Sequence, residues 1–317
     1  MPVPAAGLGY LRFFLRAQTD GILLDGKRPP AAEVMVPEVR EIRALLKILI
    51  SRGARRVRLT GDDPARRADL PDVVAMIAGL PGVSAVVATT QGIGLGGRVD
   101  DLAKAGLRGV NFHLDTLRPE RYAGGGHESE FAKVWQAIEE CLGAGIAVKL
   151  NTVLERGLND DELEDFVKLT ATRPITARFV EWNVDTDHIP APEDFIPAWE
   201  AMASIQAEME PIEPSPQAGP AILFRIPGHE GVIGFIPNVT EHLCSDCLRF
   251  GLTDAGEIVS CVFGRGLDVM RHLRSENGVT DAETFIDRVI RRKTSLAAKL
   301  AGWENPPAVG PTATPPL

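Results

Sequence analysis

The sequence predicts an α/β protein, an open partial (βα)6 TIM-like barrel with a small C-terminal α+β region. Short β-rich runs alternate with amphipathic helical segments as far as residue 205. The rhythm changes at the turn-rich stretch Pro214–Pro220, and three closely spaced cysteines follow it. We therefore expect a barrel over residues 8–212, a C-terminal region over 213–294 and a disordered tail over 295–317.

The expected strands are short apolar runs, as is typical of parallel strands that are buried on both faces. A helical segment separates each run from the next, which requires crossover connections and parallel pairing. The expected strands are Leu11–Leu15, Val57–Thr60, Ser84–Thr89, Gly109–Leu114, Ala147–Val153 and Thr176–Trp182.

The expected helices have apolar residues at helical spacing, such as Val39, Ile42 and Leu45 in the first of them. A glycine, Gly143, ends the fourth. Beyond the linker, two runs separated by Gly228–Gly231 predict a β-hairpin. The expected helices are Glu38–Arg52, Leu70–Gly79, Val99–Ala105, Phe131–Leu142, Asp160–Thr170 and Asp281–Lys293, and the hairpin strands are Ala221–Ile226 and Val232–Ile236.

The composition excludes several classes of protein. Hydrophobic residues make up 44% of the 317 residues, enough for a large core. The net charge of -9 argues against a nucleic-acid-binding protein. We see neither a secretory signal nor an apolar run long enough to span a membrane. Cysteines are scarce, which fits the reducing cytoplasm.

Three of the four cysteines, Cys244, Cys247 and Cys261, form a C-x2-C-x13-C pattern. Three thiolates suit a metal or iron–sulfur site better than a disulfide set, because one thiol would be left over. The spacing alone leaves two interpretations open: an iron–sulfur cluster, or a structural zinc with His242 or His272 as fourth ligand. The remaining thiol, Cys141, reads as a small core residue within a helix.

Polar residues recur where the predicted strands end. They are Gly61, Asp62 and Asp63 after the second strand, Thr90 after the third, His113 and Asp115 on the fourth, Lys149 and Asn151 on the fifth, and Arg178 and Glu181 on the sixth. Barrel ligands bind at the carboxyl ends of the strands, so these positions predict a ligand site, although each alone could be a turn or a packed side chain.

Four arginines, Arg12, Arg56, Arg58 and Arg249, are candidates to converge on a phosphate-bearing ligand. The guanidinium fork suits phosphate through paired hydrogen bonds. Any one of these arginines alone is better explained as a surface residue.

Longer motifs resemble the MoaA family, the radical S-adenosylmethionine (SAM) GTP 3',8-cyclases of molybdenum cofactor biosynthesis. The resemblance runs from Tyr10 to Lys293. The motifs that carry it are RVRLTG at 56–61, VNFHLDTLRPERY at 110–122, VKLNTVLERGLNDDE at 148–162 and IGFIPNVTEHLCSDC at 233–247 with the later Cys261. It implies a radical SAM type of barrel and a C-terminal [4Fe–4S] cluster on Cys244, Cys247 and Cys261.

The family carries a first cluster on C-x3-C-x2-C after its Y-L-R strand, and that cluster cleaves SAM. Counting from Arg12, those positions hold Thr19, Leu23 and Gly26. None of the three side chains ligates iron as a thiolate does. We therefore expect one cluster rather than two, and no reductive cleavage of SAM.

The positions that resemble the SAM pocket also depart from the family. The family's G-G-E-P reads GDDP at 61–64, its T-T-N-G reads TTQG at 89–92, and the serine of its S-L-D is His113. Its E-F-M-P reads EWNV at 181–184, and its C-terminal Gly-Gly is absent. The resemblance thus implies a degenerate SAM pocket comprising Gly61, Asp62, Asp63, Thr90, His113 and Arg178.

The positions that resemble the GTP contacts are better kept: Arg12, Arg56, Arg58, Lys149 and Arg249. One of the family's arginines is Gly251 here. Three hypotheses follow. The first is a MoaA-like pseudoenzyme that binds a cluster and GTP or another purine nucleotide, and that partners an active homologue or pathway enzyme. The second is an active enzyme, either a GTP 3',8-cyclase or one that uses the open iron as a Lewis acid with His113 or Lys149 as acid or base, and the third is a zinc-stabilised binding module.

Overall fold

A computed structural model describes residues 8–15, 37–124, 127–182, 193–213, 221–240, 249–261 and 265–303. Its strands form one twelve-stranded sheet in the order β12-β11-β10-β1-β2-β3-β4-β5-β6-β9-β8-β7. The barrel strands are β1 Gly9–Leu15, β2 Ala54–Gly61, β3 Ala85–Thr90, β4 Leu107–His113, β5 Ala147–Val153 and β6 Ile175–Val180. They pair in parallel with their sequence neighbours, as predicted.

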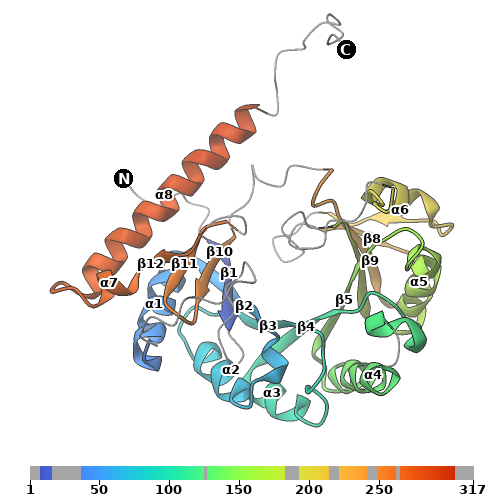
Figure 1. The fold of residues 1–317 in the computed structure, drawn as a ribbon, viewed down its shortest axis with the longest axis horizontal. Coiled ribbons are helices and arrows are strands. Elements are labelled where there is room, and N and C mark those ends of the chain that lie inside the picture. Colours follow the sequence, from blue (N-terminus) through green and yellow to red (C-terminus); the bar gives the residue numbers. More distant parts are fainter. Residues whose placement is uncertain are drawn as a thin grey trace, which may run out of the picture.

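Figure 1 shows these strands as a curved wall with α2, α3 and α4 on its outer side. Helices at the predicted positions make the crossovers between the strands, which confirms the predicted partial barrel. They are α1 Val39–Ser51, α2 Leu70–Ala78, α3 Val99–Ala105, α4 Glu128–Gly143 and α5 Leu163–Thr172. A further helix after β6, α6 (Ala198–Ser204), was not among the predicted ranges.

The later strands extend the same sheet at both of its edges. On one side β9 (Val232–Ile236) runs parallel to β6, and the predicted hairpin joins it to β8 (Ile222–Arg225), beside β7 (Glu210–Pro211). On the other side β10 (Phe250–Thr253) runs parallel to β1 and is followed by β11 (Glu257–Val259) and β12 (Leu267–Asp268). The C-terminal region therefore adds strands to the barrel wall at both edges.

The last helix is longer than the sequence pattern indicated. After the short α7 (Met270–Leu273), α8 runs from Val279 to Trp303, past the predicted end at Lys293 and into the expected tail. It packs on the first helix, where the Arg52 guanidinium contacts Asp287 at 2.9 Å and Glu283 at 3.2 Å. In the part of the chain that the structure describes, no helix is long and apolar enough to cross a membrane.

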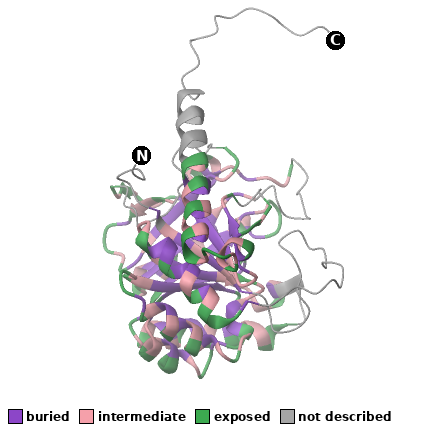
Figure 2. Cartoon of the chain, turned by 90° about the vertical axis from the view of Figure 1, so that its left-hand side faces the viewer, coloured by how far each residue is buried: buried purple, intermediate pink, exposed green. Residues whose placement is uncertain are grey.

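The strands divide their side chains between an apolar outer face and a polar inner face. In β2, Val57 and Leu59 are fully buried under the helices, whereas Arg56, Arg58 and Thr60 alternate with them. Figure 2 shows the buried residues concentrated in the strands and the exposed ones on the surrounding helices. The alternation places charged side chains inside the barrel.

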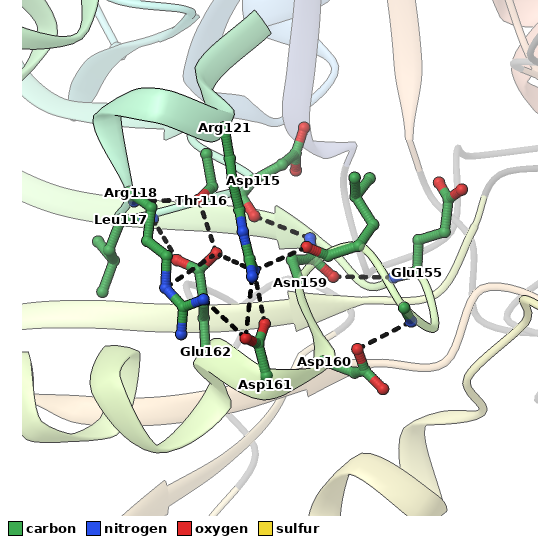
Figure 3. Close-up of polar contacts among 12 residues, drawn as sticks. Asp115, Thr116, Leu117, Arg118, Arg121, Glu155, Asn159, Asp160, Asp161 and Glu162 are labelled. Atoms are coloured by element: carbon green, nitrogen blue, oxygen red, sulfur yellow. Dashed lines mark hydrogen bonds and ion pairs between the residues drawn. The ribbon is translucent and has the colours of Figure 1, made fainter. Parts of the chain in front are cut away.

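The loops after β4 and β5 are joined by a fully buried carboxylate (Figure 3). Glu162 accepts hydrogen bonds from Thr116 Oγ1 at 2.7 Å and from the amide of Leu117 at 2.6 Å, and it faces the Arg121 guanidinium at 3.1 Å. Asp161 beside it bonds the same guanidinium but is exposed. Glu162 and Arg121 thus link the loop after β4 to the loop after β5.

Replacing Glu162 with Gln should lower the free energy of unfolding by about 3 kcal/mol, because one donor loses its acceptor oxygen and the buried carboxylate loses its charge-assisted bonds to the half-buried Arg121. Urea denaturation measures the loss. The control, Asp161→Asn, removes an exposed partner of the same arginine and should lose much less. Equal losses in the two variants would contradict the assignment of Glu162 as the anchor.

Candidate functional site

The predicted cationic residues lie together on the inner face of the sheet. The Cα register pairs Arg12 with Arg58 and Tyr10 with Arg56. It continues from Asn111 to Lys149, and from His113 through Asn151 to Arg178. Side chains at paired positions of parallel strands point to the same face. The barrel therefore brings together Arg12, Arg56, Arg58, Lys149 and Arg178, which we call the inner cation cluster.

The cluster is electrostatically strained, because its cations are buried together. Burial, together with the positive charges of Arg178, Arg56 and Arg58, lowers the pKa of Lys149 to about 8. Burial likewise lowers the pKa of Arg178 to about 10, with Arg58 adding to the effect. The pKa of Arg58 is lowered by burial and by the charges of Arg249 and Arg56, which places Arg249 near the cluster. An anion bound here would relieve this repulsion.

Two guanidinium groups of the cluster have a contact that holds them in place, while their Nε atoms stay uncommitted among the described residues. Arg178 donates through Nη2 to Asn111 Oδ1 at 2.8 Å, and Asn111 in turn donates to Ala88 O and Thr89 Oγ1. The Arg58 guanidinium lies 4.9 Å from the centre of the Tyr10 ring. Among the described residues, neither Arg58 Nε nor Arg178 Nε has a hydrogen-bond partner, although both atoms are buried. Buried donors without partners indicate a missing acceptor.

The loops after β2 and β3 bring Gly61, Asp63 and Thr90 together, as predicted for the degenerate pocket. Gly61 has φ +113°, and a Cβ there would lie 2.2 Å from the carbonyl oxygen of Leu15. The Asp63 carboxylate accepts from the amides of Ala65 (3.1 Å) and Gln91 (3.2 Å) and from Thr90 Oγ1. Three donors of the chain's own loops thus engage it, and Asp62 lies beside it in the same loop.

Two titratable groups occupy the end of β4. Burial lowers the pKa of His113, and the positive charges of Arg58 and Arg178 add to the effect against the opposing charge of Asp63. Burial raises the pKa of Asp115 to about 6, although its Oδ1 accepts from the amide of Val153 at 2.7 Å. Both side chains keep accessible surface, although the protein around them removes much of their hydration. The imidazole is therefore neutral at neutral pH.

One contact beside the cluster was not predicted from the sequence. Gly251 on β10 pairs with Arg12, and a Cβ built on it would lie 2.5 Å from Cε2 of Phe14. The Phe14 ring thus occupies the space next to the position at which the resemblance places a family arginine. The only sequence signal was the glycine itself, and nothing pointed to Phe14.

Of the cysteine trio, Cys261 is described and exposed at the end of β11, whereas Cys244 and Cys247 lie outside the described residues, as does His242. The antiparallel register pairs Gly251 with Val259, and extending it by two residues places Arg249 opposite Cys261. Arg249 follows Cys247 by two positions in the sequence, so the hairpin brings the residue next but one after Cys247 close to Cys261.

The other metal-site candidates gain no support from the described side chains. His272 stacks on Phe285, with the ring centres 4.3 Å apart. Cys141 is buried in α4, where burial raises the pKa of its thiol to about 12, which fits a core residue. The described side chains include no group of three or more His, Cys, Asp or Glu that could hold a metal ion.

A second buried carboxylate anchors the chain on the way to the cysteines. Glu181, at the end of β6, accepts hydrogen bonds from the amides of Ala198 (2.7 Å), Val239 (2.8 Å) and Thr240 (2.9 Å) and from Thr240 Oγ1 (2.6 Å). It therefore joins β6, the start of α6 and the segment that precedes Cys244.

The sequence is similar to known proteins over most of its length. Residues 29–170 match the Radical SAM superfamily, and residues 175–298 match Molybdenum Cofactor Synthesis C. The GTP 3',8-cyclase of Pelotomaculum thermopropionicum is 34% identical over 282 residues, which cover 87% of this chain and 86% of that protein. The chain belongs to the GTP 3',8-cyclase (MoaA-like) family.

Two further relatives set the extent of the similarity. The family member from Moorella thermoacetica is 35% identical over 276 residues, covering 86% of this chain and 85% of the relative. Molybdenum cofactor biosynthesis protein 1 of Mus musculus is 33% identical over 287 residues, but the chain spans only 45% of its length. Among solved structures, Streptococcus suis SuiB has a TM-score of 0.55 at 12% identity, covering 83% of this chain and 63% of SuiB, which supports the fold alone.

The lowered pKa of Lys149 predicts a pH dependence of stability. Between about pH 8 and its ordinary value of 10.5, the unfolded chain binds a proton that the folded chain lacks. The contribution of Lys149 to the free energy of unfolding should therefore rise with pH across this window. Urea denaturation at several pH values should show that Lys149→Met removes this rise, whereas Lys168→Met, on the exposed side of α5, keeps it. An identical pH dependence in Lys149→Met and the unsubstituted chain would contradict the assignment.

Proposed function

We propose that this chain is a GTP 3',8-cyclase family member that binds one [4Fe–4S] cluster and a purine nucleotide such as GTP but does not cleave SAM. The observation that carries the proposal is the inner cation cluster, whose buried Arg58 Nε and Arg178 Nε lack acceptors. It acts in the cytoplasm as a partner or regulator of an active homologue or of another enzyme of molybdenum cofactor biosynthesis.

The donor set fits one cluster. Cys244, Cys247 and Cys261 supply three thiolates, the ligands that iron–sulfur clusters prefer, and the β10–β11 hairpin supports their convergence. Three thiolates leave one iron open to a further ligand such as a purine. The positions of the family's first cluster, by contrast, hold Thr19, Leu23 and Gly26, and the match to the Radical SAM superfamily begins beyond them, at residue 29.

The nucleotide would be held by its phosphates. Arg58 and Arg178 each offer an Nε–H donor that has no partner among the described residues, and Lys149 adds an ammonium group. Phosphate oxygens would satisfy the buried donors and neutralise the cluster. The GTP 3',8-cyclases to which the chain is similar act on GTP by name, which favours a purine nucleoside triphosphate over other phosphates.

The SAM pocket is the part that we propose is lost. The Asp63 carboxylate is engaged by Ala65, Thr90 and Gln91, so it has little capacity left for the amino group of a ligand. Without first-cluster thiolates, the chain lacks ligands for the cluster that binds and reduces SAM in the family. Both features point to a chain that keeps the nucleotide half of the family's site.

A second candidate is an enzyme that carries out different chemistry at the remaining cluster. Two groups favour it: His113, whose lowered pKa leaves the imidazole neutral and free to accept a proton, and Lys149, whose pKa of about 8 allows proton exchange near neutral pH. In this alternative His113 takes a proton from the ligand, and the inner cation cluster stabilises the charge that develops.

Anaerobic reconstitution with iron counting tests the proposal. The unsubstituted chain should bind about four irons with a broad visible absorbance band. Cys261→Ala should lose both, whereas Cys141→Ala, which removes the core thiol, should keep them. About eight irons, zinc in place of iron, or release of 5'-deoxyadenosine from SAM with dithionite would refute the proposal. Turnover of GTP without 5'-deoxyadenosine would favour the second candidate.

A further inference from the structure

The open end of the β10–β11 hairpin lies next in sequence to two of the three cysteines, Cys247 and Cys261. The ladder pairs Leu252 with Ile258 and Gly251 with Val259. Beyond these pairs, one arm runs back through Arg249 toward Cys247 and the other runs through Ser260 to Cys261. The ladder ends at Gly251 and Val259, so strand pairing by itself does not set the separation of Arg249 and Ser260.

A lysine from the last helix links these two residues. The ammonium of Lys293 on α8 donates to the carbonyl oxygens of both Arg249 and Ser260. It also lies 5.0 Å from the centre of the Phe250 ring. One cation therefore bonds both Arg249, two residues after Cys247, and Ser260, the residue immediately before Cys261. An ammonium has three donors and no acceptor, which suits the bridging of two carbonyl groups.

The entry to the cysteine segment is already fixed from the opposite edge of the sheet. Glu181 binds the amides of Val239 and Thr240, four residues before Cys244. A buried anion thus holds the chain before the first cysteine, and a half-buried cation holds it after the second. Lys293 links the C-terminal side of this segment, at the Arg249 carbonyl, to the carbonyl of Ser260, the residue before Cys261.

We propose that Lys293 is a positioning residue for the iron–sulfur cluster, a clamp that holds the arms of Cys247 and Cys261 at the separation that ligation requires. The inference rests on the proposed function, because it presumes that the trio binds a cluster. It links α8 to metal retention, since release of the Lys293 ammonium would free both arms at once. Arg249, a member of the predicted nucleotide site, is held by the same bond.

The rate at which a chelator removes iron from the reconstituted protein tests the clamp. Lys293→Met keeps the length of the side chain but removes both charged hydrogen bonds, and it should release iron about tenfold faster than the unsubstituted chain. Lys293→Arg, which keeps a charged donor, should fall between them. The matched control is Lys168→Met, an exposed lysine of α5 that should match the unsubstituted chain.

Hydrogen exchange of the metal-free protein separates the clamp from a general loss of stability. Amides of residues 249–261 should exchange faster in Lys293→Met, while those of β3 and β4 stay unchanged. If Lys293→Met does not fold, Lys293→Gln, which loses the charge but keeps two N–H donors, should release iron faster than the unsubstituted chain, and equal rates would overturn the clamp. Iron release as slow as in the unsubstituted chain, or no rescue by arginine, would overturn the clamp. A chain that binds no iron at all would refute the proposed function together with this inference.

Discussion

The structure depends on one electrostatic constraint: several cations lie together inside a barrel that gives them too few anions. Burial and mutual repulsion lower the pKa of Lys149, Arg58 and Arg178 in the same direction. Such an arrangement costs stability in the ligand-free chain, and a purely structural barrel would replace it with apolar side chains. It is explained if these side chains serve a bound anion, which is why we place the nucleotide there.

Two buried ionic anchors keep the surrounding loops in place while the interior stays polar. Glu162 ties the loops after β4 and β5, and Glu181 ties the end of β6 to the chain that leads into the cysteines. Each carboxylate is satisfied by several donors, which makes burial of its charge tolerable. Lys293 has the complementary role on the other side of the cysteine segment. The loops that would surround a ligand are thus fixed by charge–dipole contacts.

The sequence predicted the repeating part of the fold because strand and helix periods are local properties. It also predicted which strand-end residues would meet, since parallel strands present their carboxyl ends at one edge. It could not predict that β9 and β10 extend the wall at opposite edges, because pairing between distant segments leaves no periodic signal. The contact of Phe14 with Gly251 and the reach of Lys293 to Arg249 and Ser260 depend on that pairing. The end of α8 was placed too early, although the run after Lys293 is rich in alanine and leucine and has no proline before Trp303.

The most direct test of the central claim is a calorimetric titration of GTP into the reconstituted protein, with and without Arg178→Met. The account predicts saturable binding to the unsubstituted chain, weakened by added salt, and an affinity about tenfold to a hundredfold lower in Arg178→Met. Arg108→Met, an exposed arginine at the far end of β4, should bind as tightly as the unsubstituted chain. Absence of binding, or equal affinity in all three proteins, would contradict the claim that the inner cation cluster exists to hold a nucleotide.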